Sequence, residues 1–439
     1  MNTIAVIILF ALVFDLVVNA AADYLNLKAL RPDLPREFQG LYDAPRYRRA
    51  QDYLKVNTRF GWLVSFVNLL VLLVFWFGGG FALLDEWVRS WHLGPVPSGL
   101  AYIGILSLLA GSVSLPFSVY ATFVIEARFG FNQTTWATFF KDRLKGLALA
   151  LVLGGPLLAA VLAFFEYAGH FAWLYGWAAV TLFMLVMQFV APTWIMPLFN
   201  RFSPLPEGRL RQAIFSYARS IDFPLDNIHV MDGSRRSRKS NAFFTGFGRH
   251  KRIVLFDTLV EKHTVEELVA VLAHEMGHYK KKHIQKSLLA GIVQSGLMFF
   301  LLSFFISEPA LFEAFYVRQP SVYAGLVFFA LVYAPLGFLS GLLMQAFSRR
   351  NEFAADRFAV DTTRAPDAMA SALKKLAVDN LTNLTPHRFY VFLNYSHPPV
   401  LQRLQAIANR LARRGGLNAD PLGSVESQRR QAFMGRTRL

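Results

Sequence analysis

Seven long apolar stretches constrain this chain more than any other feature of its sequence. Each runs for about twenty residues or more, the length that a helix needs to cross the hydrocarbon core of a bilayer. They cover residues 2–22, 60–84, 99–125, 146–165, 171–199, 287–307 and 320–347. With 54% hydrophobic and only 17% charged residues, the composition also departs from that of an ordinary globular chain. We therefore predict an α-helical integral membrane protein with seven transmembrane helices.

The first apolar stretch is interpreted as a retained span rather than a secretory signal. It lacks a basic start, and its apolar length exceeds that of a typical signal core. It contains Asp15 and Asn19, whose exposure to lipid would cost free energy, so both are expected to face other helices or a wet cavity. Cysteine is absent from the chain, which excludes disulfides and thiol catalysis.

The basic residues follow a topological pattern. The formal net charge is +16, and Lys and Arg are abundant in the first, third and fifth connections and after residue 348, but scarce in the other connections. The positive-inside rule then places the basic regions in the cytoplasm and the N-terminus outside. Topology and attraction to membrane lipids account for the charge, so no nucleic-acid partner is expected. Compact connections and no KDEL-type address favour a bacterial inner membrane, with an endoplasmic reticulum membrane as the alternative.

Two polar regions are expected to form one cytoplasmic unit: residues 200–286 and the chain after residue 348. In the first region, DNIHVMD, SNAFFTGF and HKRIVLFD are short apolar or β-branched runs bounded by Gly, Asp and charges, a pattern typical of strands in a small sheet. The pattern then changes to that of a helix, which Thr264 and Glu267 are predicted to open as a capping box.

The predicted helix contains the sequence HEMGH, a pattern found in zinc peptidases. Residues four apart lie on one face of a helix, so His274 and His278 can offer imidazole nitrogens to a single metal ion. Glu275 lies beside them and can take a proton from a water activated by zinc. The basic stretch YKKKH follows before the sixth span, which places the site on the cytoplasmic side of the membrane boundary. The alternative is an exposed helix that carries two histidines by chance.

A catalytic zinc site needs a third protein ligand. His283 is the nearest histidine, but the elongated zincin pattern requires Gly where Lys281 stands and His where Ile284 stands. Glu352, in SRRNEFAADRFAVD beyond the last span, is the preferred ligand. Asp356 lies one helical turn further, where it can orient a ligand histidine or donate a proton. The alternative is an amphipathic helix with ordinary surface acids.

Several motifs in the same order give the chain a resemblance to the type 1 CAAX prenyl proteases, a family of integral-membrane zinc metalloproteases. These motifs are SRRSRKSNAFFTGF, KRIVLFDTLVE, HEMGH, NEFAAD and YSHPPVLQRL. The resemblance implies a seven-span helical chamber whose cytoplasmic end is closed by a mainly helical, zincin-like protease domain with a small β-sheet. The expected division is a five-helix membrane domain in residues 1–205, a metallopeptidase domain with spans six and seven in 206–414, and a flexible tail in 415–439.

The resemblance also implies a metal set and a base. It assigns one Zn²⁺ ion per chain to His274, His278 and Glu352, and the role of catalytic base to Glu275.

Further catalytic or substrate-binding roles come from the same source. Asn241 matches a family position that lines the substrate groove, His397 matches one that stabilises the oxyanion, and Arg403 matches an arginine near the site. Asn and His side chains can donate hydrogen bonds to a developing oxyanion, and the edge of the SNAFF strand can pair with an extended peptide. Asp356 is also expected to be a catalytic residue.

The predicted function is therefore hydrolysis of peptide bonds in membrane-associated or prenylated CAAX-type substrates by a zinc-dependent endopeptidase. The expected partners are a peptide or protein substrate, lipidated or not, and membrane lipids. Two alternatives stay open at this point. One is a protease that removes misfolded membrane proteins, and the other is a transporter or lipid-binding protein with a structural zinc site, which would be closed by four protein ligands.

Overall fold

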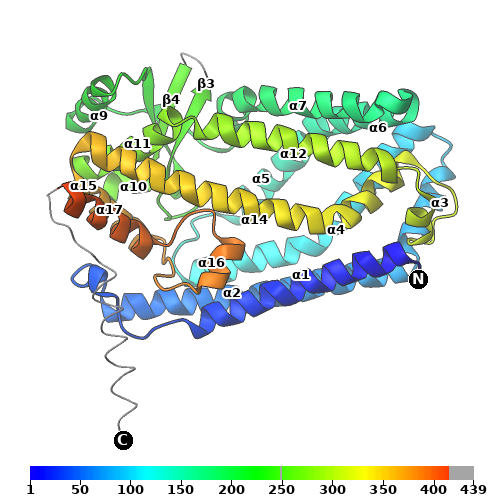
Figure 1. Ribbon diagram of the computed structural model, residues 1–439, viewed down its shortest axis with the longest axis horizontal. Coiled ribbons are helices and arrows are strands. Elements are labelled where there is room, and N and C mark those ends of the chain that lie inside the picture. The colour runs from blue at the N-terminus through cyan, green and yellow to red at the C-terminus, as the bar shows by residue number, and fades with distance from the viewer. Residues whose placement is uncertain (248–249, 415–439) are drawn as a thin grey trace, which may run out of the picture.

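The protein is elongated, with its membrane helices along the long axis and its soluble elements gathered at one end (Figure 1). The computed structural model describes residues 1–247 and 250–414. The tail expected at residues 415–439 lies outside the described residues.

Seven helical segments in the described residues are long and apolar enough to cross a membrane, which confirms the predicted number. Three of them contain a short π-helical turn, and the fifth opens with the 3₁₀ turn η4 (Gly169–Phe171). The segments are α1 (Thr3–Lys28), α2 (Ala44–Phe77), α4 (Pro95–Tyr120) with η2 (Ala121–Glu126), α5 (Trp136–Leu149) with η3 (Ala150–Gly154) and α6 (Gly155–Tyr167), α7 (Ala172–Val190) with η5 (Ala191–Ile195) and α8 (Met196–Phe199), α12 (His283–Phe305), and α14 (Val322–Thr363).

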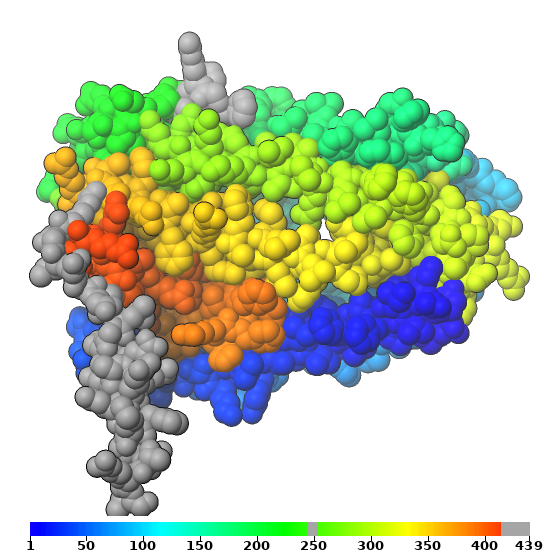
Figure 2. All heavy atoms as spheres, in the orientation of Figure 1, coloured from blue at the N-terminus to red at the C-terminus, as the bar shows by residue number. Residues whose placement is uncertain are grey.

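The spans enclose space rather than pack into a solid bundle. In the most apolar 18-residue window of each span, at most 11% of the residues are buried. A packed bundle would bury a continuous stripe on every helix. The surface beside α14 is accordingly hollowed midway along the spans (Figure 2). The helices therefore form the wall of a chamber, as expected for the fold class.

An aromatic cluster closes the chamber at the end opposite the soluble elements. The rings of Trp76 and Phe315 stack with centroids 4.7 Å apart, and Phe315 stacks on Phe328 at 4.0 Å. Phe81, from the short helix α3 (Gly80–Arg89), meets Phe315 edge to face. The helix α13 (Pro309–Glu313) completes this cap, whose buried rings fix the ends of α2 and α14.

A four-stranded mixed sheet lies at the other end. Its strands are β1 (Phe202–Pro204), β2 (Asn227–Met231), β3 (Ala242–Phe247) and β4 (His250–Phe256), in the order β1-β2-β4-β3. The strands β2 and β4 are parallel, whereas β1 and β3 pair antiparallel to their neighbours. Three of these strands were predicted, and β3 is an edge strand. The three-residue strand β1 was missed because it is too short to show an alternating pattern.

Helices from both polar regions form one soluble core with the sheet, as expected. They are α9 (Arg209–Ser220), α10 (Asp257–Lys262), α11 (Val265–Lys280), α15 (Pro366–Asp379), α16 (Arg388–Asn394) and α17 (Val400–Arg414), with the short turns η1 (Arg36–Phe38) and η6 (Gly233–Arg235) nearby. The predicted capping box opens α11: the Thr264 amide donates to Glu267 Oε2 at 2.9 Å, and the Glu267 amide donates to Thr264 Oγ1 at 3.3 Å.

Candidate metal centre

The helices α11 and α14 cross closely. This crossing brings the histidine-bearing motif of α11 next to the acidic motif of α14. Gly277 lies at the crossing, where an added Cβ would come within 3.1 Å of Phe358 Cδ1 and 3.3 Å of the Cα and O atoms of Ala355. Only a residue without a side chain allows this approach without displacing the α14 backbone. The crossing therefore places HEMGH of α11 against NEFAAD of α14.

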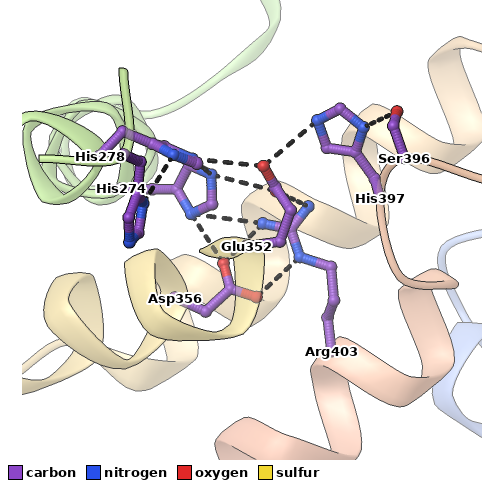
Figure 3. Close-up of polar contacts among 8 residues, drawn as sticks. His274, His278, Glu352, Asp356, Ser396, His397 and Arg403 are labelled. Carbon is purple, nitrogen blue, oxygen red and sulfur yellow. Dashed lines mark hydrogen bonds and ion pairs between the residues drawn. The ribbon is translucent and has the colours of Figure 1, made fainter. Parts of the chain in front are cut away.

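Three side chains converge at this crossing (Figure 3). The Nε2 atoms of His274 and His278 lie 3.1 Å apart. Glu352 Oε2 lies 3.4 Å from the Nε2 of His274, and Glu352 Oε1 lies 3.3 Å from the Nε2 of His278. One ligand atom from each residue lies within 4.8 Å of the others. The structure thus brings Glu352 to the two histidines from across two membrane spans.

The residues at this point fit a bound cation. Glu352 is 5% exposed, and its Oε2 has no hydrogen-bond partner among the described residues. Its charged neighbours are His274 Nε2 at 3.4 Å and Arg403 Nη1 at 3.7 Å, and a bound cation would stabilise a buried carboxylate oxygen that accepts no hydrogen bond. Two imidazoles and one carboxylate also form a donor set that suits zinc and leaves a fourth position open. The arrangement can hold a catalytic metal ion.

Asp356 and Arg403 support His274 from behind. Asp356 Oδ1 lies 2.8 Å from the Nδ1 of His274, on the side of the ring away from Glu352. Arg403 of α17 donates to both oxygens of Asp356. Burial alone would lower the pKa of His274, but the nearby carboxylates of Asp356 and Glu352 outweigh burial and raise this pKa from 6.5 to about 9. The proposed ligand His274 is therefore held by the carboxylate of Asp356, which Arg403 holds in position.

Glu275 lies between the two histidines in sequence and lines the same cavity, whose volume is about 770 Å³. Burial raises the pKa of Glu275, and the neighbouring His274 and His278 partly offset this increase. A raised pKa makes the ionised carboxylate a better proton acceptor near neutral pH. Glu275 is thus placed and tuned as a candidate general base.

Two further candidate residues border the cavity. His397, in the loop before α17, directs Nε2 to within 3.4 Å of Glu352 Oε1, while its Nδ1 lies 2.9 Å from the hydroxyl of Ser396. Asn241 precedes the edge strand β3 and lines the same cavity, with its Oδ1 accepting a hydrogen bond from the amide of Ala242 at 2.9 Å. Seven of the eight sequence-derived candidates therefore line one cavity. The eighth, Asp356, contacts His274, which lines it.

Two contacts at the site were not foreseen. The Nδ1 of His283 lies 3.1 Å from the Nδ1 of His278, a contact that the spacing argument about metal ligands does not predict. Arg349 Nη1 donates to the carbonyls of Val391 at 3.3 Å and Tyr395 at 2.5 Å, and so anchors the loop that carries His397. The position of Arg349 in the SRRNEFAAD motif was the only available signal for the second contact.

Comparisons with known proteins agree with this geometry. Residues 23–201 match the family model described as "CAAX prenyl protease N-terminal, five membrane helices", and residues 204–411 match that of peptidase family M48. A CAAX prenyl protease 1 homolog from Arabidopsis thaliana is 36% identical over 90% of this chain and 96% of its own length. CAAX prenyl protease 1 of Saccharomyces cerevisiae is 32% identical, with 85% and 88% covered. The crystal structure of S. mikatae Ste24p superposes with a TM-score of 0.88 at 30% identity, covering 93% of this chain and 99% of that one.

Proposed function

The chain belongs to peptidase family M48, within its CAAX prenyl protease 1 group, and we propose that its metal centre consists of one zinc ion held by His274, His278 and Glu352. Family membership makes the protein a membrane metalloendopeptidase. The convergence of three ligand atoms within 4.8 Å, at a buried carboxylate oxygen that accepts no hydrogen bond from the described residues, is the observation that carries the assignment.

The proposed reaction is hydrolysis of a peptide bond with Glu275 as general base. Zinc, when bound, supplies a Lewis acid that activates water and polarises the substrate carbonyl. Glu275 accepts the proton that the attacking water loses and returns it to the nitrogen of the leaving amine. Its raised pKa suits both transfers, because the same group must accept and then donate a proton.

Four other residues complete the proposed site. His397 is placed to donate a hydrogen bond from Nε2 to the oxygen that becomes negative during attack. Asn241 lies where an extended substrate would pair with the free edge of β3. Arg403 and Asp356 act through His274, which they hold in position, rather than by contact with the reacting atoms.

The proposed substrates are membrane-associated peptides, including prenylated CAAX-type proteins. The cavity at the metal centre is lined partly by residues of the spans, among them Met184 of α7 and Ile284 and Leu288 of α12. Apolar side chains beside the reacting groups can receive a lipidated segment without exposing it to water. The relatives' names also favour this substrate class over removal of misfolded membrane proteins and over a transporter with structural zinc.

The proposed orientation has the metal centre in the cytoplasm and the N-terminus outside, because the basic connections lie at the soluble end. This orientation is the same in a bacterial inner membrane and in an endoplasmic reticulum membrane. The named relatives are eukaryotic, so location in a bacterial inner membrane stays a prediction from the sequence. The proposed division remains a membrane domain in residues 1–205, a peptidase domain in 206–414 and a tail in 415–439.

Purified protein in detergent tests the proposal directly. We expect about one zinc per chain and cleavage of a farnesylated CAAX peptide, with slower cleavage of the same peptide without the lipid. Glu275→Gln is expected to keep its zinc and lose about 10²–10⁴-fold in kcat, whereas His278→Ala and Glu352→Ala lose the metal. Glu261→Gln, an exposed glutamate of α10, is the matched control and is expected to behave as wild type.

Two results would redirect the assignment. Full activity of Glu275→Gln would remove the proposed base. Cleavage of misfolded membrane proteins, with no cleavage of either CAAX peptide, would favour the quality-control alternative.

A further inference from the structure

Both candidate ligand histidines make a second contact through the ring nitrogen that faces away from Glu352. His274 Nδ1 lies 2.8 Å from a carboxylate oxygen of Asp356. His278 Nδ1 lies 3.1 Å from the Nδ1 of His283. Histidines that bind a metal through one nitrogen generally donate the N–H of the other to a fixed acceptor, which sets the tautomer and the orientation of the ring. The two ligands are thus supported alike, although by different residue types.

The chain places His283 at this contact by a strained turn. Residues 278 and 283 would lie roughly 140° apart around an uninterrupted helix, since each residue advances about 100°. The helix instead ends at Lys280, and Lys282 adopts a left-handed conformation with φ of 59° before α12 begins at His283. This conformation is unfavourable for a residue with a side chain. Non-glycine residues in such conformations persist where the surrounding structure holds them and are concentrated at functional sites.

His283 is also buried and close to the reacting groups. It is 5% exposed and lines the same cavity as His278 and Glu275. Its ring meets that of His278 edge to face, with centroids 5.1 Å apart, so the two nitrogens approach in a fixed geometry. A buried imidazole nitrogen at hydrogen-bond distance from another requires one donor and one acceptor.

On the proposed metal centre, we infer that His283 is a positioning residue: its Nδ1 accepts a hydrogen bond from the Nδ1–H of His278 and so directs the Nε2 of His278 to the metal. His283 carries its own proton on Nε2 in this arrangement. It does not bind the metal itself, which agrees with the spacing argument against His283 as a ligand. In this role His283 is the counterpart of Asp356.

The competing explanation is that His283 only fills space at the start of α12. An isosteric pair of variants separates the two. Asn places an amide oxygen close to the position of the His Nδ1 and keeps the acceptor, whereas Leu has nearly the same shape as Asn but no acceptor. A residue that only fills space would tolerate Leu at least as well as Asn, because the site is buried.

The experiment measures zinc affinity by competition with a chromogenic chelator, and the melting temperature of the metal-free protein, in full-length protein in detergent. His283→Leu is expected to weaken zinc binding about 10–100-fold and His283→Asn by less than about tenfold. The metal-free His283→Leu protein is expected to melt no lower than His283→Asn. His170→Leu, an exposed histidine of η4, controls for loss of a surface histidine and is expected to bind zinc as wild type does.

The possible outcomes separate the inference from the function on which it rests. Equal zinc affinity in His283→Leu and wild type would overturn the positioning role, as would equal losses in His283→Leu and His283→Asn. If wild-type protein and His278→Ala bound zinc equally, the proposed metal centre itself would be wrong, and the role of His283 would fall with it.

Discussion

Arg403 and Asp356 form a two-point ion pair that reaches the candidate metal centre. Arg403 Nε lies 2.7 Å from Oδ2 of Asp356, and its Nη2 lies 2.5 Å from Oδ1, the oxygen that also contacts His274. A second pair, Arg410 with Asp361, joins the same two helices at 3.0 Å. The Asp356 side chain is 3% exposed and that of Asp361 is 25% exposed. Both pairs therefore join the same two helices, but Asp356 is more buried than Asp361 and also contacts the proposed metal ligand His274.

Replacing Asp356 by Asn is expected to weaken zinc binding about 10–100-fold, because His274 loses the carboxylate that orients it. It is also expected to lower the free energy of unfolding by about 3–5 kcal/mol, because the buried Arg403 loses its two-point partner and keeps only the longer contact with Glu352, at 3.7 Å. Chelator competition and denaturant titration measure the two effects. Asp361→Asn is the matched control, with a cost of at most about 1 kcal/mol and normal zinc affinity. Equal effects of the two substitutions would contradict a special role for Asp356.

Zinc affinity is expected to depend on pH through His274. The pKa of this histidine is raised to about 9 in the metal-free protein, so at neutral pH its ring is protonated. Since a metal must displace this proton, apparent affinity is expected to increase about tenfold per pH unit between pH 7 and about 9 and then to level off. Competition titrations corrected for the chelator's own protonation measure this slope. A flat profile from pH 7 to 8.5 would show that the site binds metal without releasing this proton.

The local parts of the site could be predicted because they follow helical spacing. His274 and His278 lie four apart, as do Glu352 and Asp356, and each pair occupies one helix face in the structure. The apolar pattern also located the spans, but not their full extent. The helix α14 continues unbroken to Thr363, past the expected end of its apolar segment at 347, because a helix can leave the membrane without a break.

The contacts between motifs could not be read from spacing. The nearness of Glu352 to the histidines depends on the crossing at Gly277, and a single sequence does not record which helices cross. The contact of His283 with His278 depends on the positive φ of Lys282, and lysine gives no local signal for that conformation. The need for a third zinc ligand and the family resemblance together predicted that Glu352 lies near the histidines. Neither predicted the contact between His283 and His278.

Gly277→Ala is expected to weaken zinc binding by separating α11 from α14. The new methyl group would lie 3.3 Å from backbone atoms of Ala355, which cannot move without shifting the helix that carries Glu352. Such overpacking costs about 1–3 kcal/mol, which equals or exceeds the roughly 1 kcal/mol of helix propensity gained from Ala. Gly341→Ala is the matched control, because nothing lies within 4 Å of a Cβ added there. Chelator competition and unfolding measurements test both variants. Normal zinc affinity in Gly277→Ala would show that α11 and α14 can accommodate the added methyl group without moving the metal ligands apart.

Arg236 is expected to control substrate binding from outside the metal centre. Its guanidinium donates to both oxygens of Asp142 in α5, at 2.8 and 3.1 Å, and to Oδ1 of Asn200 at 2.9 Å. These bonds tie the segment that leads to Asn241 and the edge strand β3 to the membrane helices.

Arg236→Ala frees this segment and is expected to lower kcat/KM about tenfold, equivalent to about 1.4 kcal/mol, mainly through KM and with zinc content unchanged. Lysine is expected to rescue only part of the loss, because it cannot form the two-point contact with Asp142. Arg209→Ala removes a pair with Glu266 whose side chains are 80% and 57% exposed, and is expected to have little effect. Steady-state kinetics with a peptide substrate and zinc analysis measure these effects. A similar loss of kcat/KM in Arg209→Ala, or a loss of zinc in Arg236→Ala, would show that Arg236 does not act by positioning the substrate-binding edge.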